Sequence, residues 1–234
     1  MNGILVVDKP KGITSHDVVD AVRRRFRIKK VGHAGTLDPL ATGVLVLLVG
    51  AATKLSGRLM SEDKEYEVVM TLGRRTKTGD ADGEVILENG DFSGVTPEKV
   101  KTALAKFSGE IYQTPPMTSA IKYQGKKLYE LARKGIEIKR EPRPVTIKGM
   151  DMLEFNPPDV RIRIKCSKGT YVRVLCDDVG LELGCGAYVS NIRRTRSGDF
   201  PINEAVEFEK LRTTTRKELG LLLKNADYYK FKTT

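Results

Sequence analysis

The longest uninterrupted apolar stretch of this chain is residues 44–49, a run of valine and leucine. The run has the length of a strand that is buried on both faces, and it falls far short of the roughly 18 residues that a membrane-spanning helix needs. Hydrophobic residues make up 40% of the 234 residues, which is enough for a core around such a strand. Residues 1–10 lack the basic region and the cleavage site of a signal peptide, so we expect a cytoplasmic protein.

Further strands are predicted on both sides of this run. Residues 3–7 predict a buried strand that ends at a Lys-Pro turn, and residues 65–72 predict another strand. Residues 144–155 and 159–167 flank an Asn-Pro-Pro turn and predict an antiparallel pair.

Helical spacing of apolar residues occurs between these strands. One helix is predicted to begin with Ser15 as its N-cap, and a second to begin at Pro97. Two more are predicted at residues 171–183 and 203–211. Because helices and strands do not follow a regular β-α-β rhythm, we predict an α+β fold with a mixed, mainly antiparallel sheet flanked by helices. No linker divides residues 1–234, so we expect a single catalytic domain.

The charge of the chain indicates a polyanionic partner. There are 41 Lys and Arg residues against 30 Asp and Glu residues, which gives a net charge of +11. Residues 122–148 are the most basic segment, and glycine and proline interrupt it. This segment is either a solvated helix with its loops or a flexible arm that closes over a phosphate backbone.

The cysteines and histidines argue against a metal site. Cys166, Cys176 and Cys185 form no C-x-x-C pair, and His16 and His33 are the only histidines. We therefore expect no metal, and the odd cysteine count without a secretion signal is typical of a reducing compartment.

Residues 32–43 form a loop punctuated by three glycines and a proline, with Asp38 at its centre. Taken alone, an Asp-Pro pair in a loop is usually only a turn. The loop nevertheless resembles the aspartate-containing signature of the TruB-type pseudouridine synthases. Other segments are similar to that family's motifs in the same order, namely residues 3–12, 63–66, 72–73, 78–83, 115–120, 128–133, 168–173, 184–187 and 193–194.

The resemblance implies isomerisation of uridine 55 to pseudouridine in the T-loop of tRNA. Asp38 would be the nucleophile, attacking either the sugar C1′ or the base, and Arg173 would keep its carboxylate ionised. Tyr66 would stack on the target uracil, and a role for its hydroxyl as a proton relay is less suited to its high pKa. Tyr171 and Ile192 would form the rest of the pocket wall.

Three further roles follow from the same resemblance. His33 would fill the space that the flipped uridine leaves, Asp80 would contact a flipped nucleotide, and Lys9 would shape the site. Residues 114–142 would be a flexible, RNA-binding thumb loop. The candidate phosphate contacts on or beside the thumb are Lys122, Lys126, Lys127, Arg133, Arg140 and Arg143.

The implied reaction is not a redox reaction, so we expect no cofactor. TruB-type enzymes usually carry a small C-terminal RNA-binding domain, and too few residues follow Arg196 for one here. Ile192 also stands where the family usually has leucine. We expect a monomer that binds the T-stem and loop of tRNA, without a membrane or an obligatory protein partner.

Two other functions stay open from the sequence. One is a guide-RNA-dependent enzyme that acts on ribosomal RNA, and the other is a non-catalytic RNA-binding or tRNA-folding protein. The combination of Asp38, Tyr66 and Arg173 argues against the second function, because a binding protein does not need it.

Overall fold

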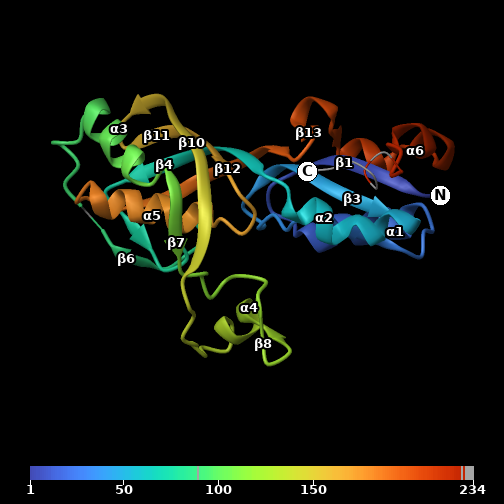
Figure 1. The fold of residues 1–234 in the computed structure, drawn as a ribbon, viewed down its shortest axis with the longest axis horizontal. Coiled ribbons are helices and arrows are strands. Elements are labelled where there is room, and N and C mark those ends of the chain that lie inside the picture. Colours follow the sequence, from blue (N-terminus) through green and yellow to red (C-terminus); the bar gives the residue numbers. More distant parts are fainter. Residues whose placement is uncertain (89, 228, 230–234) are drawn as a thin grey trace. The chain divides into compact units, whose positions relative to one another are not determined.

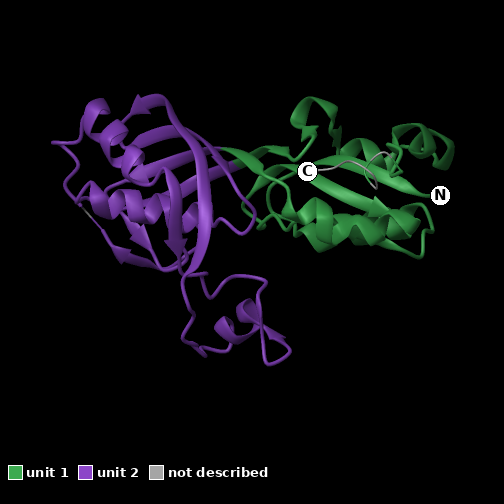
Figure 2. Ribbon diagram, in the orientation of Figure 1, with its two compact units in different colours: residues 1–66, 193–234 green, residues 67–192 purple. Residues whose placement is uncertain are grey.

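The computed structural model describes residues 1–88, 90–227 and 229, and in it the apolar run lies in strand β3 (Thr42–Val49), as predicted. The described residues group into two compact units (Figures 1 and 2). Unit 1 comprises residues 1–66 and 193–234, and unit 2 comprises residues 67–192. Strands β4 (Lys64–Leu72) and β12 (Ala187–Ser197) each begin in one unit and end in the other. The expected single domain over residues 1–234 stays a prediction.

Unit 1 is built around β3 and β1 (Gly3–Lys9), which pair antiparallel along their whole length. Its strand order is β14 (Val206–Glu207), β1, β3 and the end of β12, and β2 (Val31–His33) also pairs with β3. One face of β1 and β3 packs against the 3-10 helix η1 (Gly50–Leu55), helix α2 (Ser56–Ser61) and Phe200. This packing buries the apolar run on that side.

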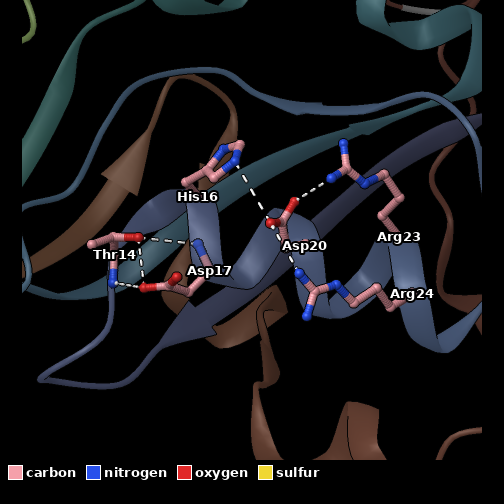
Figure 3. A network of polar contacts seen from close by, with 6 residues as sticks. All are labelled: Thr14, His16, Asp17, Asp20, Arg23 and Arg24. Atoms are coloured by element: carbon pink, nitrogen blue, oxygen red, sulfur yellow. Dashed lines mark hydrogen bonds and ion pairs between the residues drawn. The ribbon is translucent and has the colours of Figure 1, made fainter.

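Helix α1 (Ser15–Arg25) shows why the predicted helix start was wrong by one residue. Thr14, not Ser15, is the N-cap, and its hydroxyl accepts a hydrogen bond from the backbone N–H of Asp17 (Figure 3). The Asp17 carboxylate in turn accepts from the backbone N–H of Thr14, which completes a capping box. Ser15 is therefore released for a different role in the site described below.

Unit 2 is a mainly antiparallel sheet with helices against it. Its strand order is β12, β4, β11 (Asp159–Cys166), β10 (Arg143–Asn156) and β7 (Gly109–Gln113). Helix α3 (Pro97–Lys106) and helix α5 (Val172–Glu182) contact each other, and α3 also contacts β10. A separate two-stranded ribbon consists of β5 (Arg75–Thr76) and β6 (Val85–Leu87).

The thumb, residues 114–142, is an excursion between two paired strands of unit 2. The chain leaves β7 at Gln113 and returns to β10 at Arg143, and these two residues are partners in the sheet. Within the thumb lie a short hairpin, β8 (Lys122–Tyr123) and β9 (Lys126–Lys127), and helix α4 (Leu128–Ala132), drawn in yellow-green in Figure 1.

The α+β class and the mixed, mainly antiparallel pairing are confirmed. The predicted helix at residues 203–211 is wrong. That segment contains η2 (Ile202–Glu204), strand β14 and η3 (Glu209–Arg212), because Val206 and Glu207 pair with β1. Strand β12, strand β13 (Phe200–Pro201) and helix α6 (Arg216–Leu222) were not predicted. Among the described residues, no helix is long and apolar enough to cross a membrane.

Candidate active site

Asp38 lies in unit 1, on the loop that connects β2 to β3, and its side chain is half-buried. The fully buried Lys9, at the end of β1, anchors this loop. Its Nζ donates to the backbone oxygens of Pro10 and Ile13, both at 2.8 Å, and of Pro39 at 3.4 Å. Burial lowers the pKa of Lys9 to about 8, while the negative charge of Asp38 opposes this shift. Lys9 thus ties the Asp38 loop, through Pro39, to the turn that follows β1, and its role in shaping the site stays a prediction.

The residue before Asp38 is fixed by a side chain that the sequence did not assign to the site. Ser15 Oγ donates to the backbone oxygen of Leu37 at 2.9 Å and accepts from the backbone N–H of Leu37 at 2.8 Å. Beyond Asp38, the backbone N–H of Gly12 donates to the oxygen of Pro39 at 2.8 Å. Both neighbours of Asp38 are therefore held by hydrogen bonds to residues 12–15, which limits how far the carboxylate can move.

Arg194 on β12 braces the earlier part of the loop. Its guanidinium donates to the backbone oxygens of Gly35 at 3.1 Å and Thr36 at 3.4 Å, and Nε donates to Val44 at 2.7 Å. The side chain is buried at 1% exposure, so these carbonyls take the place of water around its charge. Gly43 permits the close pairing of β3 with the backbone of Arg194, because a Cβ there would lie 2.2 Å from the backbone oxygen of Arg194.

Two other predicted residues belong to unit 1. His33 ends β2, so it lies in a strand and not in the predicted loop. Tyr66 lies on β4, and both side chains are half-buried. The structure thus assembles Lys9 with the Asp38 loop and places His33 and Tyr66 in the same unit.

A second group of predicted residues forms a buried cluster in unit 2. Arg173 Nη1 pairs with Asp80 Oδ2 at 3.2 Å, with side-chain exposures of 6% and 9%. The same nitrogen donates to the backbone oxygen of Thr78 at 2.7 Å and to the hydroxyl of Thr118 at 3.0 Å. Asp80 Oδ1 accepts from the Thr78 hydroxyl at 2.6 Å and from the backbone N–H of Asp82 at 3.2 Å. Both Asp80 oxygens are therefore engaged within the protein, an arrangement that orients Arg173.

Tyr171 is fixed through its backbone. The side-chain amide of the buried Gln113 accepts from the Tyr171 N–H at 2.9 Å and donates to the Tyr171 oxygen at 3.3 Å. Gln113 is the last residue of β7 before the thumb, and Thr118 lies within the thumb. Gln113, next to the thumb, thus contacts the backbone of Tyr171, and Thr118 within the thumb contacts the side chain of Arg173. Ile192 lies on β12 and is buried.

The predicted phosphate contacts of the thumb differ in their surroundings. Lys122, Lys126, Arg133 and Arg143 are exposed. Lys127 and Arg133 each lie 5.4 Å from the centre of the Tyr129 ring, on which the two cations pack.

Arg140 has partners at both ends of the thumb. Its guanidinium donates to the backbone oxygens of Pro115 at 3.2 Å and Ile138 at 3.0 Å, and to Glu137 at 3.2 Å. This arrangement indicates a bracing role for Arg140, and a contact with RNA stays a prediction.

Ser15, Arg194, Gln113 and Thr118 were not assigned to the site from the sequence. Arg194 had a signal, because it belongs to one of the family-like motifs. Thr118 had the same kind of signal, because it lies in the family-like motif at residues 115–120. Ser15 and Gln113 act on distant segments through hydrogen bonds that no local pattern predicts. In the part of the chain that the structure describes, no group of three or more His, Cys, Asp or Glu residues could hold a metal ion.

Comparison with known proteins relates this arrangement to one family. Residues 23–172 match the family described as TruB family pseudouridylate synthase (N terminal domain). Residues 173–226 match the tRNA pseudouridylate synthase B C-terminal domain.

Curated relatives extend the similarity over most of the chain. The tRNA pseudouridine synthase B of Pelotomaculum thermopropionicum is 50% identical over 93% of this chain and 70% of its own length. The protein of the same name from Alkaliphilus oremlandii is 48% identical over 95% of this chain and 74% of its own length.

Among solved structures, the fold is similar to that in a Cbf5-Nop10-Gar1 complex, with a TM-score of 0.71 and 32% identity over 98% of this chain. An archaeal box H/ACA sRNP Nop10-Cbf5 complex has a TM-score of 0.67 and 30% identity over 90% of this chain. This chain spans 55% and 53% of the matched chains in those two structures. The family match, the relatives of nearly 50% identity and the braced aspartate loop agree, and the chain belongs to the TruB family of pseudouridylate synthases.

Proposed function

We propose that this chain isomerises uridine to pseudouridine at position 55 in the T-loop of tRNA. The observation that carries this proposal is the Asp38 loop, which is held on both sides of the aspartate and closed by two buried cations, Lys9 and Arg194. The relatives that are 46–50% identical are named tRNA pseudouridine synthase B, which supports tRNA as the substrate. The Cbf5 chains are about 30–32% identical, so a guide-dependent enzyme is the less supported alternative.

The reaction needs a carboxylate and a closed pocket, and no electron carrier. The bond between N1 and C1′ breaks, the uracil turns, and a bond between C5 and C1′ forms. C5 loses its proton and N1 gains one, so there is no net oxidation. Asp38 supplies the carboxylate, which attacks either C1′ or the base. Both routes break and form the same bonds overall and move the same protons.

We assign Arg173 the role of counter-charge to the attacking carboxylate. A guanidinium suits this role because it stays protonated at all accessible pH values. The buried Asp80, together with the Thr78 oxygen and the Thr118 hydroxyl, fixes where its nitrogens point. We assign Asp80 the positioning of Arg173, and its predicted contact with a flipped nucleotide stays a prediction.

The target uridine has to leave the stacked T-loop before it reaches Asp38. Extrusion costs a few kcal/mol, and side chains that replace lost stacking offset part of it. Tyr66 stacks on the extruded uracil, Tyr171 and Ile192 complete the pocket, and His33 fills the vacated space. Because the substrate is tRNA, we place the enzyme in the cytoplasm, active without a guide RNA or protein partner.

Asp38→Asn tests the chemistry. The variant keeps the size of the side chain but loses the nucleophilic charge, whereas binding depends on phosphate contacts and stacking elsewhere. We expect no pseudouridine by chemical mapping of an unmodified tRNA, with an affinity within about tenfold of the original enzyme, or about 1.4 kcal/mol.

Asp91→Asn is the matched control, because Asp91 is an exposed aspartate whose carboxylate caps the N–H of Ser93 in a turn. It should leave turnover unchanged. Near-normal turnover by Asp38→Asn would remove Asp38 from the chemistry. Activity of the original protein only when a guide RNA is added would favour the alternative function.

A further inference from the structure

Unit 1 contains a hollow that no step of the proposed reaction uses. Its volume is about 550 Å³, and it lies where the N-terminus, the end of α1, the start of η1 and the start of α6 meet. We call it the basic hollow, because five cationic side chains line it and no acidic residue does. These cations are Arg27, Lys29, Lys30, Lys54 and Arg216.

No described acidic side chain neutralises the charge of the basic hollow. Among the described residues, none of these five cations forms an ion pair. By contrast, Arg23 and Arg24 on α1 form ion pairs with Asp20 at 2.8 and 3.8 Å (Figure 3). A concave surface lined by charges of one sign concentrates its field and attracts oppositely charged ligands.

Arg27 occupies a backbone position that ordinarily belongs to glycine. Its φ is 52°, and the N–H of Ile28 donates back to the oxygen of Arg23 at 3.0 Å, which closes the end of α1. Glycine is favoured at this left-handed position because it has no Cβ. An arginine here costs conformational free energy, which indicates that its side chain serves a purpose other than ending the helix.

Stabilisation of helix ends explains only part of the cluster. Cations after α1 interact favourably with its C-terminal carbonyl groups, and Arg216 donates to the oxygen of Phe26 at 2.9 Å. Arg216, however, is the first residue of α6, where the helix dipole disfavours a cation. Lys54 comes from η1, a separate segment. The helices therefore do not explain why the five cations converge on one hollow.

The basic hollow lies at the opposite end of unit 1 from the Asp38 loop. The loop leads into the start of β3 at Thr42, whereas Gly50 in the hollow follows the end of β3 at Val49. The 8 residues of this strand span about 25 Å at roughly 3.3 Å each. Strand β1 runs between the same two places, from the residue after Asn2 in the hollow to Lys9, which donates to Pro39 of the loop. The N–H of Ala51 donates to Asn2 Oδ1 at 2.8 Å.

We propose that the basic hollow binds the phosphodiester backbone of tRNA outside the T-stem and loop. The identity of the RNA rests on the proposed function, and we take the T-stem and loop to lie on the Asp38 loop and the predicted thumb. A second cationic site, separated from the Asp38 loop by the length of β3 (about 25 Å), is then assigned to a different part of the folded tRNA. This contact is sequence-independent and adds affinity for the whole tRNA over its isolated arm.

The double variant Lys29→Gln/Lys54→Gln tests the contact by binding alone, so its result does not depend on turnover. Its control is Lys101→Gln/Lys210→Gln, which removes the same charge from exposed positions outside the hollow. Each protein is titrated with an unmodified full-length tRNA and with the isolated T-stem and loop, at several salt concentrations.

For the full-length tRNA, we expect the slope of log K against log salt to become less steep by about two units in the hollow variant. The affinity of this variant should fall by about tenfold near physiological salt. Binding of the isolated arm and the behaviour of the control should not change. Equal losses on both RNAs, no loss on either, or the same loss in the control would overturn the proposal. Loss of binding to phosphatidylserine vesicles, with tRNA binding intact, would assign the hollow to a membrane surface instead.

Arg27→Gly separates binding from stability in a second way. Glycine relieves the left-handed strain, so the melting temperature should stay the same or rise, while affinity for the full-length tRNA falls three- to tenfold. An arginine that only ended the helix would give unchanged tRNA affinity, and that result would contradict the proposal. Pseudouridine formation on the isolated arm should remain normal, and its absence in the unaltered protein would instead count against the proposed function.

Discussion

Asp80→Asn tests whether the buried ion pair positions Arg173. The substitution keeps the shape of the side chain and removes the charge that lies 3.2 Å from Arg173 Nη1. Removing one partner of a buried ion pair typically costs about 3–5 kcal/mol, because the other charge stays buried. Here Arg173 keeps its bonds to the Thr78 oxygen and the Thr118 hydroxyl, so we expect a loss of about 2–3 kcal/mol.

The free energy of unfolding is measured by urea denaturation, and the rate of pseudouridine formation is measured at saturating tRNA. The loss of stability corresponds to a fall in melting temperature of roughly 4–12 °C for a chain of this size. Because Arg173 loses one of the groups that orient it, the maximal rate should fall more than the affinity for tRNA.

The matched control is Asp82→Asn, an exposed aspartate two residues away whose change should stay within about 0.5 kcal/mol. A double-mutant cycle with Arg173→Gln should give a coupling energy of about 1–3 kcal/mol. Asp80→Asn with unchanged stability and unchanged maximal rate would refute the positioning role.

Three further predictions follow from the same structure. Gly43→Ala should abolish activity and lower stability, because its φ is 99° and the new Cβ would meet the Arg194 oxygen; a normal melting temperature would show that the loop can yield. Ser15→Ala should lower stability by about 1–3 kcal/mol and lower the maximal rate, because it leaves both backbone groups of Leu37 without their partner; Ser15→Thr is the variant that can restore the bonds. Burial raises the pKa of Asp178 to about 6, so the folded state favours its protonated form, and stability is lost as the pH rises from about 4 through 6. Asp178→Asn should therefore be about 1 kcal/mol more stable at pH 7, after allowance for solvent screening, with no advantage near pH 4, and denaturation curves at both pH values check this.

The elements that were predicted correctly carry their signals locally. Strand β3 is an unbroken apolar run, and α3 begins with a threonine N-cap followed by proline. Strands β10 and β11 flank a proline turn and pair antiparallel, as their pattern indicated. In each case neighbouring residues alone favour the observed conformation.

Strand β12 was missed because its inward face is partly polar. Its buried positions include Arg194 and Ser197, which break the apolar alternation that marks a strand. Arg194 is tolerated inside only because carbonyls from the Asp38 loop accept its hydrogen bonds. The helix predicted at residues 203–211 was wrong because of another long-range contact. Val206 and Glu207 pair with β1, and this pairing overrides the helical spacing of the segment.

The sequence by itself determined the fold class, the buried strands and the basic thumb, and its motifs predicted a site with Asp38, Tyr66 and Arg173. Only the tertiary structure decided what holds them in place. Ser15 and Leu37 are 22 residues apart, and Arg194 and Gly35 are 159 residues apart, yet their hydrogen bonds shape one loop. The physical reason is that a buried carbonyl group is satisfied by whichever donor the packing brings to it, and short-range sequence patterns do not record that choice.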